Sequence, residues 1–331
     1  MREICRGDNV DLGTAASFRT QWEAESGPQA APPTNPIPLL LRAHQAPGDA
    51  VSMTAAVYSL HRAHPGKYRT SVDSLWPEIF AHNPDVSVAQ PGAAELRMNY
   101  PAVSQSNERS IHFMQSWCEF MGSALGVHVP LLTNRPHIYF DPATAPPRTE
   151  NFWVVCSGGK GDFTNKLWGH GSYQEVVDRL GGTTRFVQVG AAADDHPRLL
   201  GAEDMVGKTS LRELFELVRR ARGVLCGVSL LMHVAAALER PAVVVAGGRE
   251  PTAWNVYPYQ QYVHTVGVLQ CHDAQGRIGA CWRSRVVPVG DGTALDRDTC
   301  EYPVGGLPLC MTIIRPSEVA DKIRLYNRMR T

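Results

Sequence analysis

The sequence predicts an α/β protein built from two domains with doubly wound parallel sheets, and three observations support this. Short apolar strands alternate with helical segments through residues 152–246, which is typical of parallel strands connected by helices. A Pro-rich, aperiodic stretch at 141–149 separates this region from the first half and is typical of a linker. The 331 residues, 44% apolar and 19% charged, suffice for two cores of ordinary size.

The first half contains the elements expected of one such domain. An N-terminal extension, 1–36, is rich in Ala, Pro, Ser and Gly, and its lack of periodicity predicts a loosely ordered segment. The first domain, 37–145, is predicted to have strands at 38–42, 68–72, 86–89, 96–98 and 137–140. Helical spacing of apolar residues predicts helices at 51–63 and 111–125.

The second half is predicted in the same way. The second domain, 150–265, has apolar strands at 152–156, 186–189, 223–225 and 242–246 and helices at 173–180, 210–221 and 231–238. A cysteine-rich segment follows at 266–312, and a C-terminal helix lies within 313–331. Two such domains are expected to place the carboxyl ends of their strands on either side of a central cleft, where ligands of this fold class bind.

Composition limits the function classes. Lys plus Arg and Asp plus Glu are both 32, so the net charge is zero and argues against a general nucleic-acid or membrane-surface binder. No apolar run is long enough to span a membrane, and the first residues lack the core of a secretory signal. We therefore expect a cytoplasmic protein. Cys118, Cys156 and Cys226 lie in apolar patterns typical of buried, reduced thiols.

Two segments are suited to binding phosphate. Residues 229–233 should form the N-terminus of a helix, whose free N–H groups and dipole favour an anion. The glycine-rich loop 157–166 follows a strand, and its Lys160, Thr164 and Lys166 could supply charge and a hydroxyl to a diphosphate. The loop lacks the Gly-Lys-Ser/Thr ending of a Walker motif. A lysine here could equally be a solvated surface charge.

These motifs together resemble glycosyltransferase family 9, the heptosyltransferases that use ADP-heptose. The resemblance covers residues 38–258 and depends on Gly48-Asp49, Lys166-Leu167-Trp168 with Tyr173, 206–211, 232–236, and Gly248 with Pro251-Thr252. It implies the GT-B architecture, in which two Rossmann-like domains face a central cleft. It also implies an inverting transfer of a sugar, heptose by analogy, from a nucleotide-diphosphate donor to a hydroxyl.

By this resemblance, Asp49 is the base that activates the acceptor hydroxyl, because such a transfer needs a carboxylate within hydrogen-bond reach of it. The alternative is that Asp49 caps the following helix. The predicted donor-binding residues are Lys160, Thr164, Lys166, Ser229, Met232, His233, Gly248 and Thr252. Among them, Lys166 is expected to neutralise the leaving diphosphate, and His233 could instead be a structural histidine.

The chain departs from the family pattern at two positions. Val228 and Leu230 stand where the family usually has an acidic residue and a glycine, which removes an expected contact to a sugar hydroxyl. The identity of the donor sugar is therefore less certain than its diphosphate.

Four cysteines in the tail predict a metal site. Cys271, Cys281, Cys300 and Cys310 are separated by 9, 18 and 9 residues in a polar segment with little core of its own. Four thiolates around one tetrahedral zinc or iron would supply stability and leave no open coordination position, so the metal would be structural. His272 could replace one ligand; two disulfides or unlinked thiols are the alternatives. A similar cluster holds iron in the branch of the family that heptosylates bacterial autotransporters.

The sequence thus predicts a glycosyltransferase that needs no cofactor for chemistry. Its acceptor is a glycan, such as a lipopolysaccharide core sugar, or a protein, and a homo-oligomer is expected rather than a nucleic-acid partner. Two alternative functions remain open: a non-catalytic nucleotide-sugar-binding or assembly protein with the same fold, and a nucleotide-sugar epimerase. The final helix near 316–326 resembles the terminal helix that crosses back over the first domain in GT-B enzymes.

Overall fold

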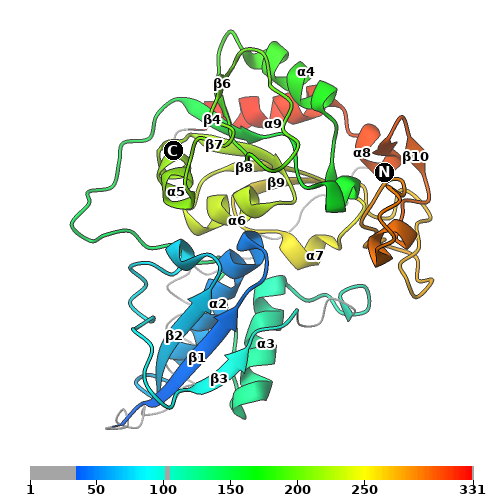
Figure 1. Ribbon diagram of the computed structural model, residues 1–331. Helices are drawn as coiled ribbons and strands as arrows, with labels where there is room; N and C mark the ends of the chain where they lie inside the picture. Colours follow the sequence, from blue (N-terminus) through cyan, green and yellow to red (C-terminus); the bar gives the residue numbers. More distant parts are fainter. Residues whose placement is uncertain (1–34, 101–104, 330–331) are drawn as a thin grey trace, which may run out of the picture.

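A computed structural model describes residues 35–100 and 105–329, so nearly all of the predicted N-terminal extension lies outside the described part. Two sheet-containing domains lie one above the other, and the cysteine-rich segment lies at the side of the second domain (Figure 1). Among the described residues, no helix combines the length and apolar character needed to cross a membrane.

The first domain contains a three-stranded parallel sheet in the order β2-β1-β3. Its elements are β1 (Ile37–Ala43), α2 (Pro47–Ala63), β2 (Tyr68–Ser74), η1 (Pro77–Ile79), β3 (Ala94–Arg97) and α3 (Phe113–Leu125). Alternate residues of β1, namely Leu39, Leu41 and Ala43, are buried in the core, as expected for a strand with one covered face. Pro47 begins α2, where a missing N–H costs nothing.

Two predicted strands of this domain are wrong. Val86 makes only an isolated bridge to Thr70, and prolines at 84 and 91 deprive the flanking backbone of donors. Residues 137–140 form no strand because they lie against α2 instead of pairing with the sheet: the His137 N–H donates to Thr54 Oγ1 at 2.8 Å, and the His137 ring stacks on Tyr58.

The second domain is a six-stranded parallel sheet in the order β6-β5-β4-β7-β8-β9. The strands are β4 (Phe152–Cys156), β5 (Arg185–Gln188), β6 (Ala202–Asp204), β7 (Gly223–Gly227), β8 (Ala242–Gly247) and β9 (Gln260–His264). The chain goes outward to β5 and β6 on one side of β4 and returns to β7 on the other. The switch point between β4 and β7 is where ligands of open α/β sheets bind.

Helices cover this sheet, and one of them corrects a prediction. They are η3 (Gly161–Lys166), α4 (His170–Leu180), α5 (Leu211–Arg220), α6 (Leu230–Ala237), α7 (Thr252–Asn255) and α9 (Pro316–Arg328). The helix α9 does not cross back over the first domain: it packs against α4 and β8. Its apolar face, formed by Val319, Ala320 and Ile323, is fully buried in the core of the second domain, which fixes it there.

The two domains touch through apolar side chains. Helix α2 packs against α6, and the Phe113 ring at the start of α3 stacks on Trp254 of α7 with centroids 4.8 Å apart. One continuous hydrophobic core therefore includes residues of both domains. Where the sequence predicts a cleft, the first turns of α2 and α6 are in direct contact.

The tail contains little regular structure, as its composition predicts. Its short elements are η4 (Ala294–Arg297), β10 (Pro303–Val304), β11 (Leu307–Pro308) and α8 (Leu309–Thr312). Residues 281–286 have no strand or helix of their own, and polar contacts hold them in place.

Candidate active site

Asp49 lies in the first turn of α2 and faces the second domain. The helix begins at Pro47 with Ala46 at the N-cap, so Asp49 is two residues inside the helix and does not cap it. Its Oδ2 accepts a hydrogen bond from the Tyr100 hydroxyl at 2.8 Å. The carboxylate is thereby oriented, while Oδ1 stays available.

Burial raises the pKa of Asp49, and three groups oppose this shift: the Tyr100 hydroxyl first, then the ammonium groups of Lys166 and Lys160. The influence of both lysines places them near the carboxylate, although they come from the other domain. A carboxylate with a raised pKa is a better proton acceptor in general base catalysis. The geometry thus suits the predicted role of Asp49.

Lys166, at the end of η3, forms an ion pair with Glu250 in the loop after β8. The Lys166 Nζ and Glu250 Oε1 atoms are 2.7 Å apart, and the Glu250 side chain is only 4% exposed. Glu250 also accepts hydrogen bonds from Arg249 and Asn255. Burial lowers the pKa of Lys166, whereas Glu250 raises it.

The first glycines of the loop 157–166 pack closely against another loop of the same domain. A Cβ on Gly158 would lie 1.8 Å from the Asp195 carbonyl oxygen, and the Gly159 N–H donates to that same oxygen at 3.1 Å. The missing side chain at 158 therefore allows a close approach of the 191–196 loop. Lys160 is exposed on the same loop and remains free to move.

The cysteine-rich segment touches both site loops. The Asn165 N–H donates to the Ser284 carbonyl at 3.1 Å, and the Val286 N–H donates to Thr164 Oγ1 at 3.0 Å. On the other side, Arg249 Nε donates to the Arg283 carbonyl at 2.7 Å. We call residues 281–286 the strap, because they connect the loop after β4 to the loop after β8.

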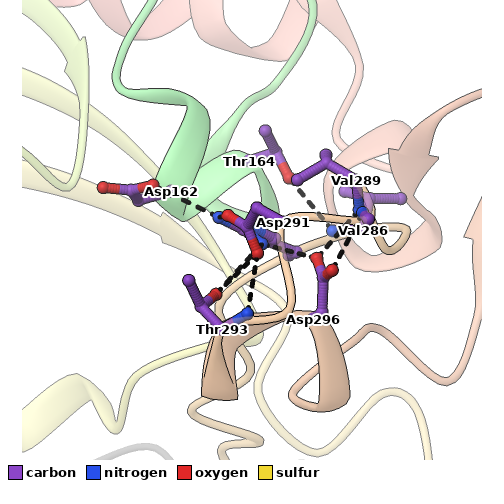
Figure 2. A network of polar contacts seen from close by, with 9 residues as sticks. Asp162, Thr164, Val286, Val289, Asp291, Thr293 and Asp296 are labelled. Atoms are coloured by element: carbon purple, nitrogen blue, oxygen red, sulfur yellow. Dashed lines mark hydrogen bonds and ion pairs between the residues drawn. The ribbon is translucent and has the colours of Figure 1, made fainter.

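Arg285 anchors the strap. Figure 2 shows the network of polar contacts around it, with Asp162, Asp291 and Asp296 labelled. The Arg285 side chain is 2% exposed and pairs with Asp291 at 2.6 Å, Asp296 at 2.5 Å and Asp162 at 3.3 Å. The first two carboxylates belong to the tail, and Asp162 belongs to η3. The tail therefore folds around this guanidinium and is attached through it to the loop that carries Lys166.

At the N-terminus of α6, the predicted donor-binding residues lie in different surroundings. The Ser229 hydroxyl is buried and lies beside the Cys226 thiol. Met232 is fully buried in the core. His233 Nδ1 lies 2.8 Å from the Tyr257 hydroxyl, and burial lowers the pKa of His233 to about 3, so the ring is neutral and structural. A Cβ on Gly48 would lie 3.3 Å from the Leu230 Cα.

The remaining predicted donor residues lie at the loop after β8. Gly248 faces the tail, since a Cβ there would lie 3.4 Å from the Cys310 Cβ, and its carbonyl accepts the Cys281 N–H. Thr252 is half-buried and begins α7. Lys160, Lys166 and Asp49 are thus brought together, whereas Met232 and Gly248 face other parts of the molecule. The Tyr100 contact and the Arg249–Glu250–Asn255 cluster were not predicted.

The four tail cysteines are neighbours but do not form a ligand set. Burial raises the pKa of Cys271 to about 12, and the thiols of Cys281, Cys310 and Cys300 contribute to this rise. All four are free thiols. Among the described residues, no group of three or more His, Cys, Asp or Glu side chains is arranged to hold a metal ion. The structural metal predicted for these thiols therefore stays a prediction.

Comparison with known proteins confirms the resemblance drawn from the motifs. The family model described as glycosyltransferase family 9 (heptosyltransferase) matches residues 133–278, which span the linker, the second domain and the start of the tail. The enzyme class predicted from the sequence, a glycosyltransferase, is supported by this match. A search of curated protein sequences finds no relative that matches the chain.

Solved structures share the fold at low sequence identity. The iron-containing dodecameric glycosyltransferase TibC from enterotoxigenic E. coli H10407 matches with a TM-score of 0.59 and 18% identity over 89% of this chain and 77% of TibC. The E. coli ADP-heptose lipopolysaccharide heptosyltransferase II matches with a TM-score of 0.55 and 14% identity over 87% of this chain and 98% of that one. The predicted GT-B fold is confirmed.

Proposed function

We propose that the protein is an inverting glycosyltransferase that transfers heptose from ADP-heptose to a hydroxyl of a protein or glycan acceptor. The observation that carries this proposal is the approach of Asp49, on the first domain, to Lys166 and Lys160 on the second. A base and two cations at the facing edges of the domains are what a displacement of a diphosphate requires. The heptosyltransferase TibC has been solved in complex with ADP-D-beta-D-heptose, which supports the choice of donor.

In the proposed reaction, Asp49 accepts the proton of the acceptor hydroxyl through Oδ1 while Tyr100 holds Oδ2. The acceptor oxygen attacks the anomeric carbon, the new C–O bond forms, and the bond from that carbon to the diphosphate breaks. ADP leaves with the electron pair of this bond. Attack opposite the leaving group inverts the anomeric configuration.

Three groups of the second domain would stabilise the departing diphosphate. Lys166 and Lys160 supply positive charge. The N-terminus of α6, with Ser229 at its N-cap, supplies backbone N–H groups. All three lie at the carboxyl end of the sheet, next to the switch point between β4 and β7.

One contact favours a second candidate, a nucleotide-sugar-binding or assembly protein that performs no transfer. The first turn of α2 lies so close to α6 that a Cβ on Gly48 would be 3.1 Å from the His233 ring. A diphosphate at the α6 N-terminus therefore requires a small separation of the domains. A protein that never separates them would not bind the donor there.

The test uses full-length protein with ADP-heptose and a mixture of glycan and protein acceptors, and measures ADP release and acceptor mass. We expect transfer by the wild type, a loss of at least about 10²-fold in Asp49→Asn, and nearly unchanged donor binding in that variant. Asp321→Asn, on the exposed face of α9, is the matched control. Full transfer by Asp49→Asn would contradict the assigned base, and binding without any transfer would favour the second candidate.

A further inference from the structure

We propose that Glu250 is a positioning residue that holds the Lys166 ammonium in its charged form and in place for the donor diphosphate. The identity of the ligand rests on the proposed function, whereas the effect of Glu250 on Lys166 does not. Glu250 would touch neither the sugar nor the acceptor, and it would act only through Lys166.

The Glu250 carboxylate is fixed from three sides. Its Oε1 accepts from Lys166 Nζ and from Arg249, and its Oε2 accepts from Asn255 at the end of α7. Because the side chain is 4% exposed, water does not compete for these bonds. A buried carboxylate with three donors has one orientation, and it imposes that orientation on the Lys166 side chain.

The pair spans the expected phosphate site. Lys166 follows β4 and Glu250 follows β8, and β7 lies between these strands in the sheet. The turn after β7 leads through Ser229 into the N-terminus of α6. The Lys166–Glu250 ion pair therefore links the two loops on either side of β7, the strand that leads into this helix terminus.

Arg249 is not an alternative partner for the diphosphate. Its Nε donates to the Arg283 carbonyl, its Nη2 to the Trp282 carbonyl, and its Nη1 to Glu250. The guanidinium is thus committed to the strap and to Glu250. The Lys166 ammonium has three N–H donors, of which Glu250 engages one, so two remain for phosphate oxygens.

The charge of Lys166 depends on a small set of groups. Glu250 and Asp49 raise its pKa, whereas burial and the neighbouring Arg249 lower it, with burial the largest influence. The His233 ring also faces Lys166 but is neutral. Glu250 is the largest of the influences that favour the protonated form. Without it, a half-buried amine would face a guanidinium and one carboxylate from the other domain.

The first experiment measures the charge of Lys166 directly and needs no ligand. The chain has five lysines, at 67, 160, 166, 208 and 322, so a spectrum of ¹³Cε-labelled lysine can be assigned with Lys166→Arg and titrated. We expect Glu250→Gln to lower the pKa of Lys166 by at least about one unit. Glu175→Gln, an exposed pair on α4, should leave it unchanged. An unchanged Lys166 titration in Glu250→Gln overturns the proposal.

The second experiment measures ADP binding against pH. We expect Glu250→Gln to bind ADP about as well as the wild type at acidic pH and at least about tenfold more weakly at alkaline pH, where Lys166 is neutral. Glu250→Gln with Lys166→Arg should regain binding at alkaline pH, because arginine stays protonated. A loss that is equal at all pH values, with no rescue by arginine, would show a merely structural role and overturn the proposal.

Two controls keep the outcomes distinct. Glu250→Asp keeps the negative charge, so it should retain the wild-type pH profile and serves if the Gln variant folds poorly. If the wild type binds neither ADP nor any nucleotide sugar, the proposed function fails, yet the lysine titration still decides whether Glu250 maintains the charge of Lys166.

Discussion

His112 connects the two domains as a neutral ring, and this makes the stability of the protein dependent on pH. Its Nδ1 accepts the Met114 N–H at 3.1 Å and caps α3, while its Nε2 lies 3.1 Å from the Val256 carbonyl oxygen of the second domain. Only the tautomer with a proton on Nε2 satisfies both contacts. A second proton, on Nδ1, would face the Met114 N–H and break the cap.

Burial lowers the pKa of His112 to about 4 from an ordinary value of 6.5, against a smaller opposite effect of the bond to Val256. In the unfolded chain the imidazole takes up a proton near 6.5, so between these two values the unfolded state binds more protons. The free energy of unfolding therefore falls as the pH decreases through this window. For these two values, the contribution of His112 decreases by about 2 kcal/mol between pH 7.5 and pH 5.

Replacement of His112 by Asn tests this, since Asn caps helices well but does not titrate. Urea unfolding of the wild type and His112→Asn is measured at pH 7.5 and at pH 5, and each protein is compared with itself. The lost contact to Val256 weakens the variant equally at both values. We expect the decrease in unfolding free energy between the two pH values to be about 2 kcal/mol smaller in the variant. An identical decrease in both proteins would refute the reasoning.

Two further predictions concern the tail. Arg285→Leu removes the guanidinium that pairs with Asp162, Asp291 and Asp296. We expect a lower free energy of unfolding in urea, because the carboxylates lose their partner, and weaker ADP binding, because the strap supports the Lys166 loop. Arg324→Leu, exposed on α9, should change neither. If the tail cysteines hold a metal in solution, the purified protein will contain one equivalent of zinc or iron by elemental analysis. The Cys281→Ser variant will lose this metal. A metal-free protein of full stability would contradict the predicted site.

The second domain was predicted well because buried parallel strands are continuous apolar runs. The strand β4 was predicted at its observed bounds, and β8 to within one residue. The strands β6 and β9 were missed, since Ala202–Asp204 is short and Gln260–His264 is largely polar. In the first domain, local patterns could not show that residues 137–140 pack on a helix, because the contact to Thr54 spans 83 positions.

In the candidate site, the sequence motifs located residues correctly where a loop follows a strand, because the end of the strand fixes where that loop begins. Asp49 and Lys166 each follow a strand end, and the structure brings them near one another. For Met232, a position within the first turn of a helix did not reveal that the side chain is fully buried. The ion pair of Lys166 with Glu250, 84 positions away, has no sequence signal beyond the two charges.

The strap explains why a polar tail without regular structure belongs to this fold. The loops after β4 and β8 lie on either side of β7 in the sheet and meet through the Lys166–Glu250 ion pair. The strap joins the same loops through backbone groups, which accept from Arg249 and donate to Thr164. Arg285 pairs with carboxylates of both η3 and the tail and so links these two segments. Removal of residues 266–312 would remove these bonds to Arg249 and Thr164, so the cysteine-rich segment supports both loops of the candidate donor site.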